Sequence, residues 1–285
     1  MNLFEQTVEA VLANQQEYVV LRPALEKEIL HQDILRALSK AGLLSKLTFI
    51  GGTCLRACYG SERLSEDLDF TGGFDFQKSD LENIGDILQM AIWQKYNLSV
   101  RVLEPVKEIG NTRTWKIKII TAPQRTDLPP QQINIDVCLL PSYERRPVML
   151  KNYYGLEAGT SGLIILAESL PEILADKIIA IALRSNRVKN RDLWDIHWLK
   201  SRNITLSEAL LKQKLIDRQI EFTDFYQRYT ERLEQLRMQQ KDFLAEMRRF
   251  LTPAAFNAEL ADKYWWQNFL LLLQDLGVFG NFRKY

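Results

Sequence analysis

The 285-residue sequence predicts an α+β fold, in which a mixed α/β core is flanked by helices on both sides. Short apolar segments bounded by turn residues occur between residues 46 and 165, and some alternate polar and apolar side chains as β-strands do. Helical spacing dominates before and after this stretch. We therefore expect two domains. Residues 1–165 comprise an N-terminal helical cap (1–45) and a mixed sheet (46–165), and residues 166–285 form a C-terminal helical domain.

The N-terminal residues show the apolar period of an amphipathic helix. Leucine and isoleucine recur at spacings of three and four from Leu25 to Leu38. Pro23 is suited to the first turn of a helix, and Gly42 is suited to its end. This segment is therefore expected to be helical throughout.

The central region alternates predicted strands with predicted helices. The expected strands are 47–50, 68–71, 98–103, 114–120 and 133–139. The expected helices are 53–59 and 79–96. In the second helix, Ser79 is the expected N-cap and Glu82 completes a capping box. In the fourth strand, Lys116 and Lys118 alternate with isoleucines, so both lysines share one face. A proline-rich connection, 121–132, precedes the last strand.

The C-terminal part is predicted to be almost entirely helical from Pro171 onward. A charged, amphipathic stretch covers Leu206 to Met247, and a last apolar helix covers about Ala261 to Leu276. Amphipathic faces of this kind more often pack in a core than bind a partner.

The overall charge indicates that this protein does not coat nucleic acid or membrane by bulk electrostatics. The formal net charge is only +1, so any site for an anion must be local. No apolar run is long enough to span a bilayer, and the N-terminus lacks the basic-then-apolar order of a signal peptide. We therefore expect a cytoplasmic protein with no membrane partner.

The three cysteines indicate a reducing compartment, because their number is odd and their spacing forms no disulfide framework. Cys54 and Cys58 lie one helical turn apart, but no histidine or further cysteine accompanies them. Two small buried residues are therefore favoured over a zinc site.

Two adjacent glycines are the first feature with chemical meaning. Gly51 and Gly52, followed by Thr53, come directly after a predicted strand and open a predicted helix. Backbone N–H groups at such a turn, together with the helix dipole, attract anions, and glycine lets a phosphate approach closely. The turn is therefore a candidate phosphate site, although a pair of glycines by itself more often marks an ordinary turn.

Two aspartates follow in the next predicted strand. Asp67 and Asp69 are two residues apart and so project from the same face. Like charges so close together repel unless a cation lies between them, and Mg²⁺ takes one or two carboxylates together with substrate phosphates. Asp136, a polar residue in an otherwise apolar strand, would supply a third carboxylate. Triphosphate beside magnesium is the arrangement of a nucleotide-transfer site.

The segment that carries these residues resembles the signature of the AbiEii/AbiGii nucleotidyltransferase toxin family, within the polymerase beta-like nucleotidyltransferase superfamily. The matching residues are Gly51, Gly52, Thr53, Leu55, Arg56, Tyr59, Gly60, Arg63, Ser65, Glu66, Asp67, Leu68, Asp69 and Phe70. A second similar block runs from Glu172 to Lys177 and continues through Arg184 to the segment 191–195. The resemblance implies a polymerase beta-like core sheet.

The resemblance also implies roles for individual residues. Metal ligands would be Asp67, Asp69 and Asp136, which with Lys177 and Asp192 form the catalytic set. Phosphates of the nucleotide would be bound by Gly51, Gly52, Thr53, Arg56, Arg63, Ser65 and Lys177. Basic residues also exceed acidic ones between Arg184 and Arg202, so RNA contacts are expected at Arg184, Arg187 and Arg191, although such charges often only face solvent.

The predicted function is transfer of a nucleoside monophosphate from an NTP to an acceptor hydroxyl, with Mg²⁺ or Mn²⁺ as cofactor. By resemblance, the acceptor is the 3′ end of tRNA, translation is blocked, and a separately encoded antitoxin exists that need not bind this chain. Three alternatives remain at this point: nucleotide transfer to a protein side chain, a non-catalytic nucleotide-binding protein with this fold, and a sugar-nucleotide glycosyltransferase with an Asp-x-Asp motif.

Overall fold

The computed structural model describes residues 1–106, 110–125, 127–156 and 160–276. The chain forms two compact units, Met1–Ala167 and Glu168–Tyr285, which are described separately below. Residues 277–285 of the predicted C-terminal domain lie outside the described ranges. Within those ranges, each helix is too short or too polar to serve as a membrane span.

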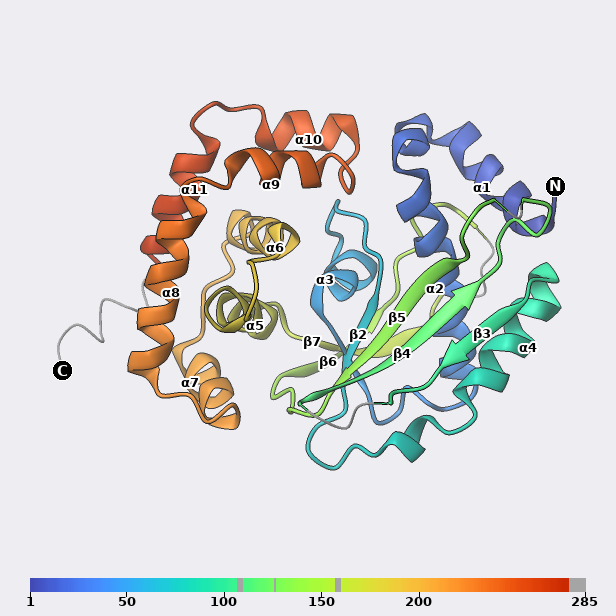
Figure 1. Cartoon of the computed structure of the whole chain (residues 1–285), viewed down its shortest axis with the longest axis horizontal. Coiled ribbons are helices and arrows are strands. Elements are labelled where there is room, and N and C mark those ends of the chain that lie inside the picture. The colour runs from blue at the N-terminus through green and yellow to red at the C-terminus, as the bar shows by residue number, and fades with distance from the viewer. Residues whose placement is uncertain (107–109, 126, 157–159, 277–285) are drawn as a thin grey trace. The chain divides into compact units, whose positions relative to one another are not determined.

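The N-terminal residues are helical, as predicted (Figure 1). Helix α1 (Leu3–Asn14) is followed by a 3-10 helix (Gln16–Leu21) and by α2 (Arg22–Lys40). Asn2 caps α1 by accepting a hydrogen bond from the backbone nitrogen of Glu5 at 2.8 Å. These helices supply much of the buried apolar surface against which the sheet packs.

A seven-stranded mixed sheet forms the core of the first unit, with the order β3-β4-β5-β2-β1-β7-β6. Its strands are β1 (Thr48–Ile50), β2 (Leu68–Thr71), β3 (Val100–Leu103), β4 (Thr112–Ile119), β5 (Gln131–Cys138), β6 (Arg145–Met149) and β7 (Ile164–Glu168). Strand β2 pairs with β1 in antiparallel orientation and with β5 in parallel orientation, whereas β4 is antiparallel to both β3 and β5. The predicted α+β class is confirmed; β6 and β7 were not predicted.

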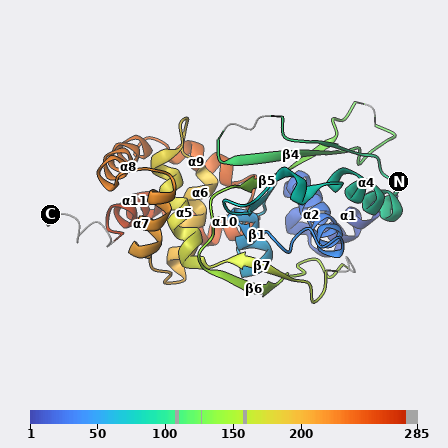
Figure 2. The same ribbon diagram turned by 90° about the horizontal axis from the view of Figure 1, so that it is seen from below.

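The two faces of this sheet differ in polarity. Alternate residues of β4 (Trp115, Ile117 and Ile119) are buried, as are those of β5 (Ile133, Ile135 and Val137). Helix α4 (Ile84–Tyr96) packs against β3 and α2, and Figure 2 shows α1, α2 and α4 on the same side of β4. The polar residues that alternate with these apolar ones therefore lie on the other face of the sheet.

The predicted helix at 79–96 is wrong in its first turn. A short 3-10 helix, Lys78–Leu81, occupies that place, and α4 begins only at Ile84. The capping box is formed by Gln77 and Asp80, not by Ser79 with Glu82. Asn83 then adopts a left-handed conformation with φ of 62°, which interrupts the helix.

The second unit is helical, as predicted. Its helices are α5 (Leu170–Leu183), α6 (Asn190–Ser201), α7 (Glu208–Asp217), α8 (Phe222–Leu236), α9 (Gln240–Met247), α10 (Pro253–Leu260) and α11 (Trp265–Gln274). Helix α5 is the centre of the packing, because it contacts α6, α7 and α8. Its start is fixed by Ser169, whose side chain accepts from the backbone nitrogen of Glu172 at 3.3 Å.

Candidate active site

Strand β1 leads directly into a short helix at the paired glycines. Helix α3 covers Gly51–Cys54, and a π-helical turn, Leu55–Tyr59, prolongs it. Gly51 has a φ of +75°, and a Cβ at this position would lie only 2.9 Å from Oδ2 of Asp69. Both the backbone conformation and the available space therefore require glycine. The same close approach places the carboxylate of Asp69 at the start of the helix.

Asp69 and Asp136 are direct neighbours in the sheet. They are register partners on the parallel strands β2 and β5, so their side chains point to the same face, with the two strands about 4.8 Å apart. Thr114 lies opposite Asp136 on β4, and its hydroxyl donates to Oδ1 of Asp136 at 2.5 Å. The structure thus brings together two carboxylates that are far apart in the sequence.

Asp67 lies immediately before β2 and turns toward β5. Its Oδ1 accepts a hydrogen bond from the backbone nitrogen of Asn134 at 3.0 Å. In the part of the chain that the structure describes, no group of three His, Cys, Asp or Glu side chains is arranged to hold a metal by itself. The donor set of Asp69 and Asp136 nevertheless fits Mg²⁺, because this ion takes one or two carboxylates together with phosphate oxygens of a substrate.

The segment before β2 is tied to α3 by hydroxyl groups. The Thr53 hydroxyl is 2.6 Å from the Ser65 hydroxyl and also donates to the backbone oxygen of Asp67. Arg63 is buried as well, and its Nη1 donates to the backbone oxygen of Leu64 at 2.9 Å. These three predicted phosphate ligands therefore have side chains bound within the protein. Their contacts fix the position of Asp67 relative to the glycine turn.

Arg56 lies in a buried ion pair. Its Nε is 3.2 Å from both carboxylate oxygens of Glu28, its Nη1 donates to the Ser61 carbonyl at 3.1 Å, and its guanidinium lies 3.7 Å from the ring centre of Tyr153. Burial by itself would lower the pKa of Arg56, but Glu28 together with the surrounding tyrosines outweighs burial and holds the pKa well above its ordinary value. A direct contact between Arg56 and a phosphate would require this ion pair to open.

Three residues of α2 hold the segment from the other side, and the sequence did not single them out. Glu28 accepts from the backbone nitrogen of Ser65 at 3.3 Å, His31 Nε2 lies 3.1 Å from the Glu66 carbonyl oxygen, and Lys27 pairs with the Glu66 carboxylate at 3.0 Å. Burial lowers the pKa of His31 to about 4, so the imidazole is neutral at neutral pH. The available signal was that Glu28 and His31 fall inside the apolar run of α2.

The second family-like block forms an ion cluster within the second unit. The ammonium of Lys177, on α5, lies 2.6 Å from Asp192 and 2.7 Å from Asp195, both on α6. Arg184 approaches the other carboxylate oxygen of Asp192 at 3.0 Å. Burial favours a higher pKa for Asp192, but the charges of Lys177 and Arg184 outweigh it, so its pKa lies below the ordinary value. The predicted residues Lys177 and Asp192 are thus in direct contact.

The predicted RNA-binding arginines have different surroundings. Arg187 is exposed, whereas Arg184 is bound to Asp192. Arg191 lies 3.8 Å from the carboxylate of Glu246, and its guanidinium is 4.8 Å from the ring centre of Phe250. Of these three side chains, Arg187 is therefore the most accessible.

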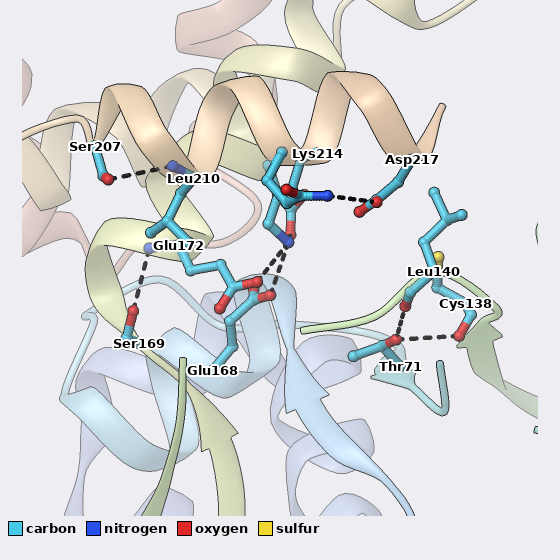
Figure 3. A network of polar contacts seen from close by, with 12 residues as sticks. Thr71, Cys138, Leu140, Glu168, Ser169, Glu172, Ser207, Leu210, Lys214 and Asp217 are labelled. Atoms are coloured by element: carbon cyan, nitrogen blue, oxygen red, sulfur yellow. Dashed lines mark hydrogen bonds and ion pairs between the residues drawn. The ribbon is translucent and has the colours of Figure 1, made fainter. Parts of the chain in front are cut away.

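A second buried cluster in the same unit surrounds Lys214 (Figure 3). Its ammonium lies 3.1 Å from Glu168, 2.9 Å from Glu172 and 2.8 Å from Asp176. Burial and the nearby charge of Asp176 raise the pKa of Glu168 well above its ordinary value. The cluster joins α7 to α5, and the four-residue spacing of the three acids was the sequence signal for it.

Comparisons with known proteins concern the fold first and then the family. The structure is similar to that of MenT4, a nucleotidyltransferase toxin from Mycobacterium tuberculosis H37Rv, with a TM-score of 0.52 and 15% identity over 95% of this chain and 98% of that chain. It is also similar to that of JHP933 from Helicobacter pylori, with a TM-score of 0.44 and 18% identity over 91% and 90% of the two chains. A comparison with curated proteins gave no match.

The sequence matches the family of the nucleotidyl transferase AbiEii toxin of type IV toxin–antitoxin systems over residues 33–265. This range includes the glycine turn, the aspartates of β2 and β5, and the ion cluster of α5 and α6. Since the match covers well over half of the chain, the protein belongs to the AbiEii toxin family and is a nucleotidyltransferase.

Proposed function

We propose that this enzyme transfers a nucleoside monophosphate from an NTP to the 3′-terminal hydroxyl of tRNA, releases pyrophosphate and thereby blocks translation. Membership of a nucleotidyltransferase toxin family supports nucleotide transfer and an NTP substrate. The observation that carries the proposal is the register of Asp69 with Asp136, next to the glycine turn that begins α3.

The turn and the acids have complementary roles in this proposal. Backbone N–H groups of Gly51, Gly52 and Thr53 bind the β- and γ-phosphates at the start of the helix. Asp69 and Asp136, with Asp67 beside them, would hold Mg²⁺, or Mn²⁺ in its place. The ion would supply positive charge against the phosphates and the entering and leaving oxygens.

The bond changes follow from this arrangement. The acceptor oxygen forms a bond to the α-phosphorus, the bond from that phosphorus to the bridging oxygen breaks, and pyrophosphate leaves. Asp136 favours removal of the proton from the attacking hydroxyl, because its carboxylate faces the same side of the sheet as Asp69. The family resemblance assigns triphosphate charge to Lys177, whose ammonium is held within the second unit by Asp192 and Asp195.

The partners belong to the same proposal. Family membership implies an antitoxin, and we assume no direct contact between the antitoxin and this chain. Arg184, Arg187 and Arg191 remain proposed RNA contacts, with Arg187 the most accessible of them. A cytoplasmic location would give the enzyme access to NTPs and tRNA.

A label-transfer assay tests the proposal. Purified protein, Mg²⁺ and each NTP in turn, labelled at the α-phosphate, are incubated with total bacterial tRNA or without RNA. Asp69→Ala is the inactive variant, and Asp75→Ala is its matched control because Asp75 is an exposed aspartate in the same region. We expect label on tRNA with the wild type and with Asp75→Ala, and none with Asp69→Ala.

Other outcomes identify the alternatives. Label on protein instead of RNA would make a side chain the acceptor. Nucleotide binding with no label on any acceptor would favour a non-catalytic protein, and turnover of labelled sugar nucleotides would favour glycosyl transfer. Circular dichroism of each variant shows whether a loss of label reflects misfolding.

A further inference from the structure

The face of the sheet that carries the two aspartates continues across the neighbouring strands. Asp136 pairs with Thr114 of β4, and the next residues of β4 on that face are Lys116 and Lys118. Lys118 in turn pairs with Arg101 of β3. We call Arg101, Lys116 and Lys118 the basic strip.

The basic strip is on the accessible side of the sheet. Arg101 and Lys116 are exposed and Lys118 is half-buried, whereas the residues between the lysines and on either side of them, Trp115, Ile117 and Ile119, are buried on the opposite face. Strand β4 therefore has one apolar face toward the helices and one polar face that can receive a partner.

The charges of the basic strip have no acidic partner among the described residues. Arg101 and Lys118 are cross-strand partners, so their Cβ atoms lie about 5 Å apart, and like charges in this position are destabilising. Among the residues that the structure describes, these three basic side chains form no ion pair and no side-chain hydrogen bond. Their register neighbours on β5, Gln132 and Asn134, are neutral. Bound anions would remove the repulsion.

The order of the strands separates this surface from the proposed nucleotide site. Strands β5 and β2, which carry the two aspartates, lie between β4 and β1, and the glycine turn follows β1. The basic strip and the glycine turn are thus on opposite sides of the acid pair. Thr114, beside Asp136, and Lys118 are four residues apart on an extended strand, or about 14 Å. When triphosphate is bound at the glycine turn, the basic strip is therefore still available to bind another anion.

We propose that the basic strip binds the phosphate backbone of the RNA acceptor and leads its 3′ end to Asp69 and Asp136. The inference rests on the proposed function, because it assumes an RNA acceptor. RNA is favoured over an acidic polypeptide because the basic strip runs toward the acid pair, where the acceptor hydroxyl must arrive. Positively charged surfaces that follow the backbone are how proteins hold single-stranded nucleic acid.

The test compares two triple variants with equal loss of charge. The strip variant is Arg101→Gln with Lys116→Gln and Lys118→Gln. The control is Lys40→Gln with Arg145→Gln and Arg146→Gln, three exposed basic residues of the same unit on α2 and on edge strand β6. Binding of fluorescent tRNA is measured by anisotropy at several salt concentrations, and nucleotide transfer is measured in parallel.

The strip variant should bind tRNA at least about tenfold more weakly at low salt, and the slope of log affinity against log salt should fall by about 2 for three lost phosphate contacts. The control should stay close to the wild type in both quantities. The KM for NTP should be unchanged in both variants, because the basic strip lies away from the glycine turn.

Separate outcomes decide the inference and the proposed function. Unchanged tRNA affinity in the strip variant, or equal losses in both variants, would overturn the inference. Competition by polyglutamate as strong as that by RNA would also overturn it and would indicate an acidic protein partner. If the strip variant alone loses tRNA binding while wild-type protein transfers no label to tRNA, the RNA surface stands and the proposed acceptor fails.

Discussion

Replacement of Arg56 by methionine should destabilise the first unit and leave nucleotide binding intact. The side chains of Arg56 and Glu28 are only 5% and 7% exposed, and their charged atoms are 3.2 Å apart. Removing one partner of a buried ion pair leaves an uncompensated charge, which costs about 3–5 kcal/mol. Glu28 would keep hydrogen bonds from Tyr154 and from the backbone of Ser65, so the lower end of this range applies.

The expected loss can be measured as a shift in unfolding. A cost of about 3 kcal/mol corresponds to a fall in Tm of roughly 6–12 °C for a unit of this size. Urea and thermal unfolding of Arg56→Met give the stability, and the KM for NTP is measured at a temperature where the variant is folded. The double variant Glu28→Gln with Arg56→Met removes both charges, so it should be less destabilised than the sum of the single variants.

The opposite pattern would refute this reasoning. If Arg56→Met unfolds like the wild type while its KM for NTP rises at least about tenfold, a change of about 1.4 kcal/mol in binding, then Arg56 contacts the phosphates as the family resemblance implied. Additive losses in the double variant would show that Arg56 and Glu28 do not stabilise each other.

Three further predictions concern the glycine turn and two buried ionisable groups. Gly51→Ala should reduce label transfer about 100-fold because the added Cβ displaces Asp69, whereas Gly42→Ala, with φ of +74° but open space, should show only backbone strain and full activity. Stability should fall by about 3 kcal/mol as pH drops from 6.5 toward 4, because the folded pKa of His31 is about 4 and the unfolded chain takes up the proton first. The free energy of unfolding of His31→Gln, measured in urea, should not fall in this way between pH 6.5 and 4. Asp192 has a pKa below its ordinary value of 3.8, so its contribution to the free energy of unfolding is complete above pH 3.8 and is lost as the pH falls further. The stability of Asp192→Asn should not show this loss at acidic pH.

The strands that carry the aspartates could be predicted from their alternating side chains. Which strands lie next to each other in the sheet could not. Asp69 and Asp136 each lie in a segment with a clear strand pattern, but their adjacency depends on the register of β2 with β5, which local sequence does not encode. Strand β6 was missed because it is an exposed edge strand that contains Pro147, and proline is unfavourable in a strand interior.

The contacts that hold the site depend on tertiary packing and were harder to predict. Glu28 and His31 have the helical spacing that solvent-facing residues also have, and their bonds to the segment before β2 form only when that segment packs on α2. Arg56 matched the family signature, yet its sequence position does not show whether the guanidinium faces a phosphate or Glu28. The role of each signature residue therefore has to be judged from its contacts.

The contacts of α2 also set the shortest piece of this protein that can be expected to fold. The family match begins at residue 33, beyond both Glu28 and His31. A fragment cut there would keep both glycines and all the motif aspartates, yet it would lose the carboxylate that neutralises Arg56 and the imidazole beside Glu66. The segment with the glycines and aspartates therefore needs α2 to keep its structure. Chimeras that exchange catalytic segments between relatives should be joined before Lys27.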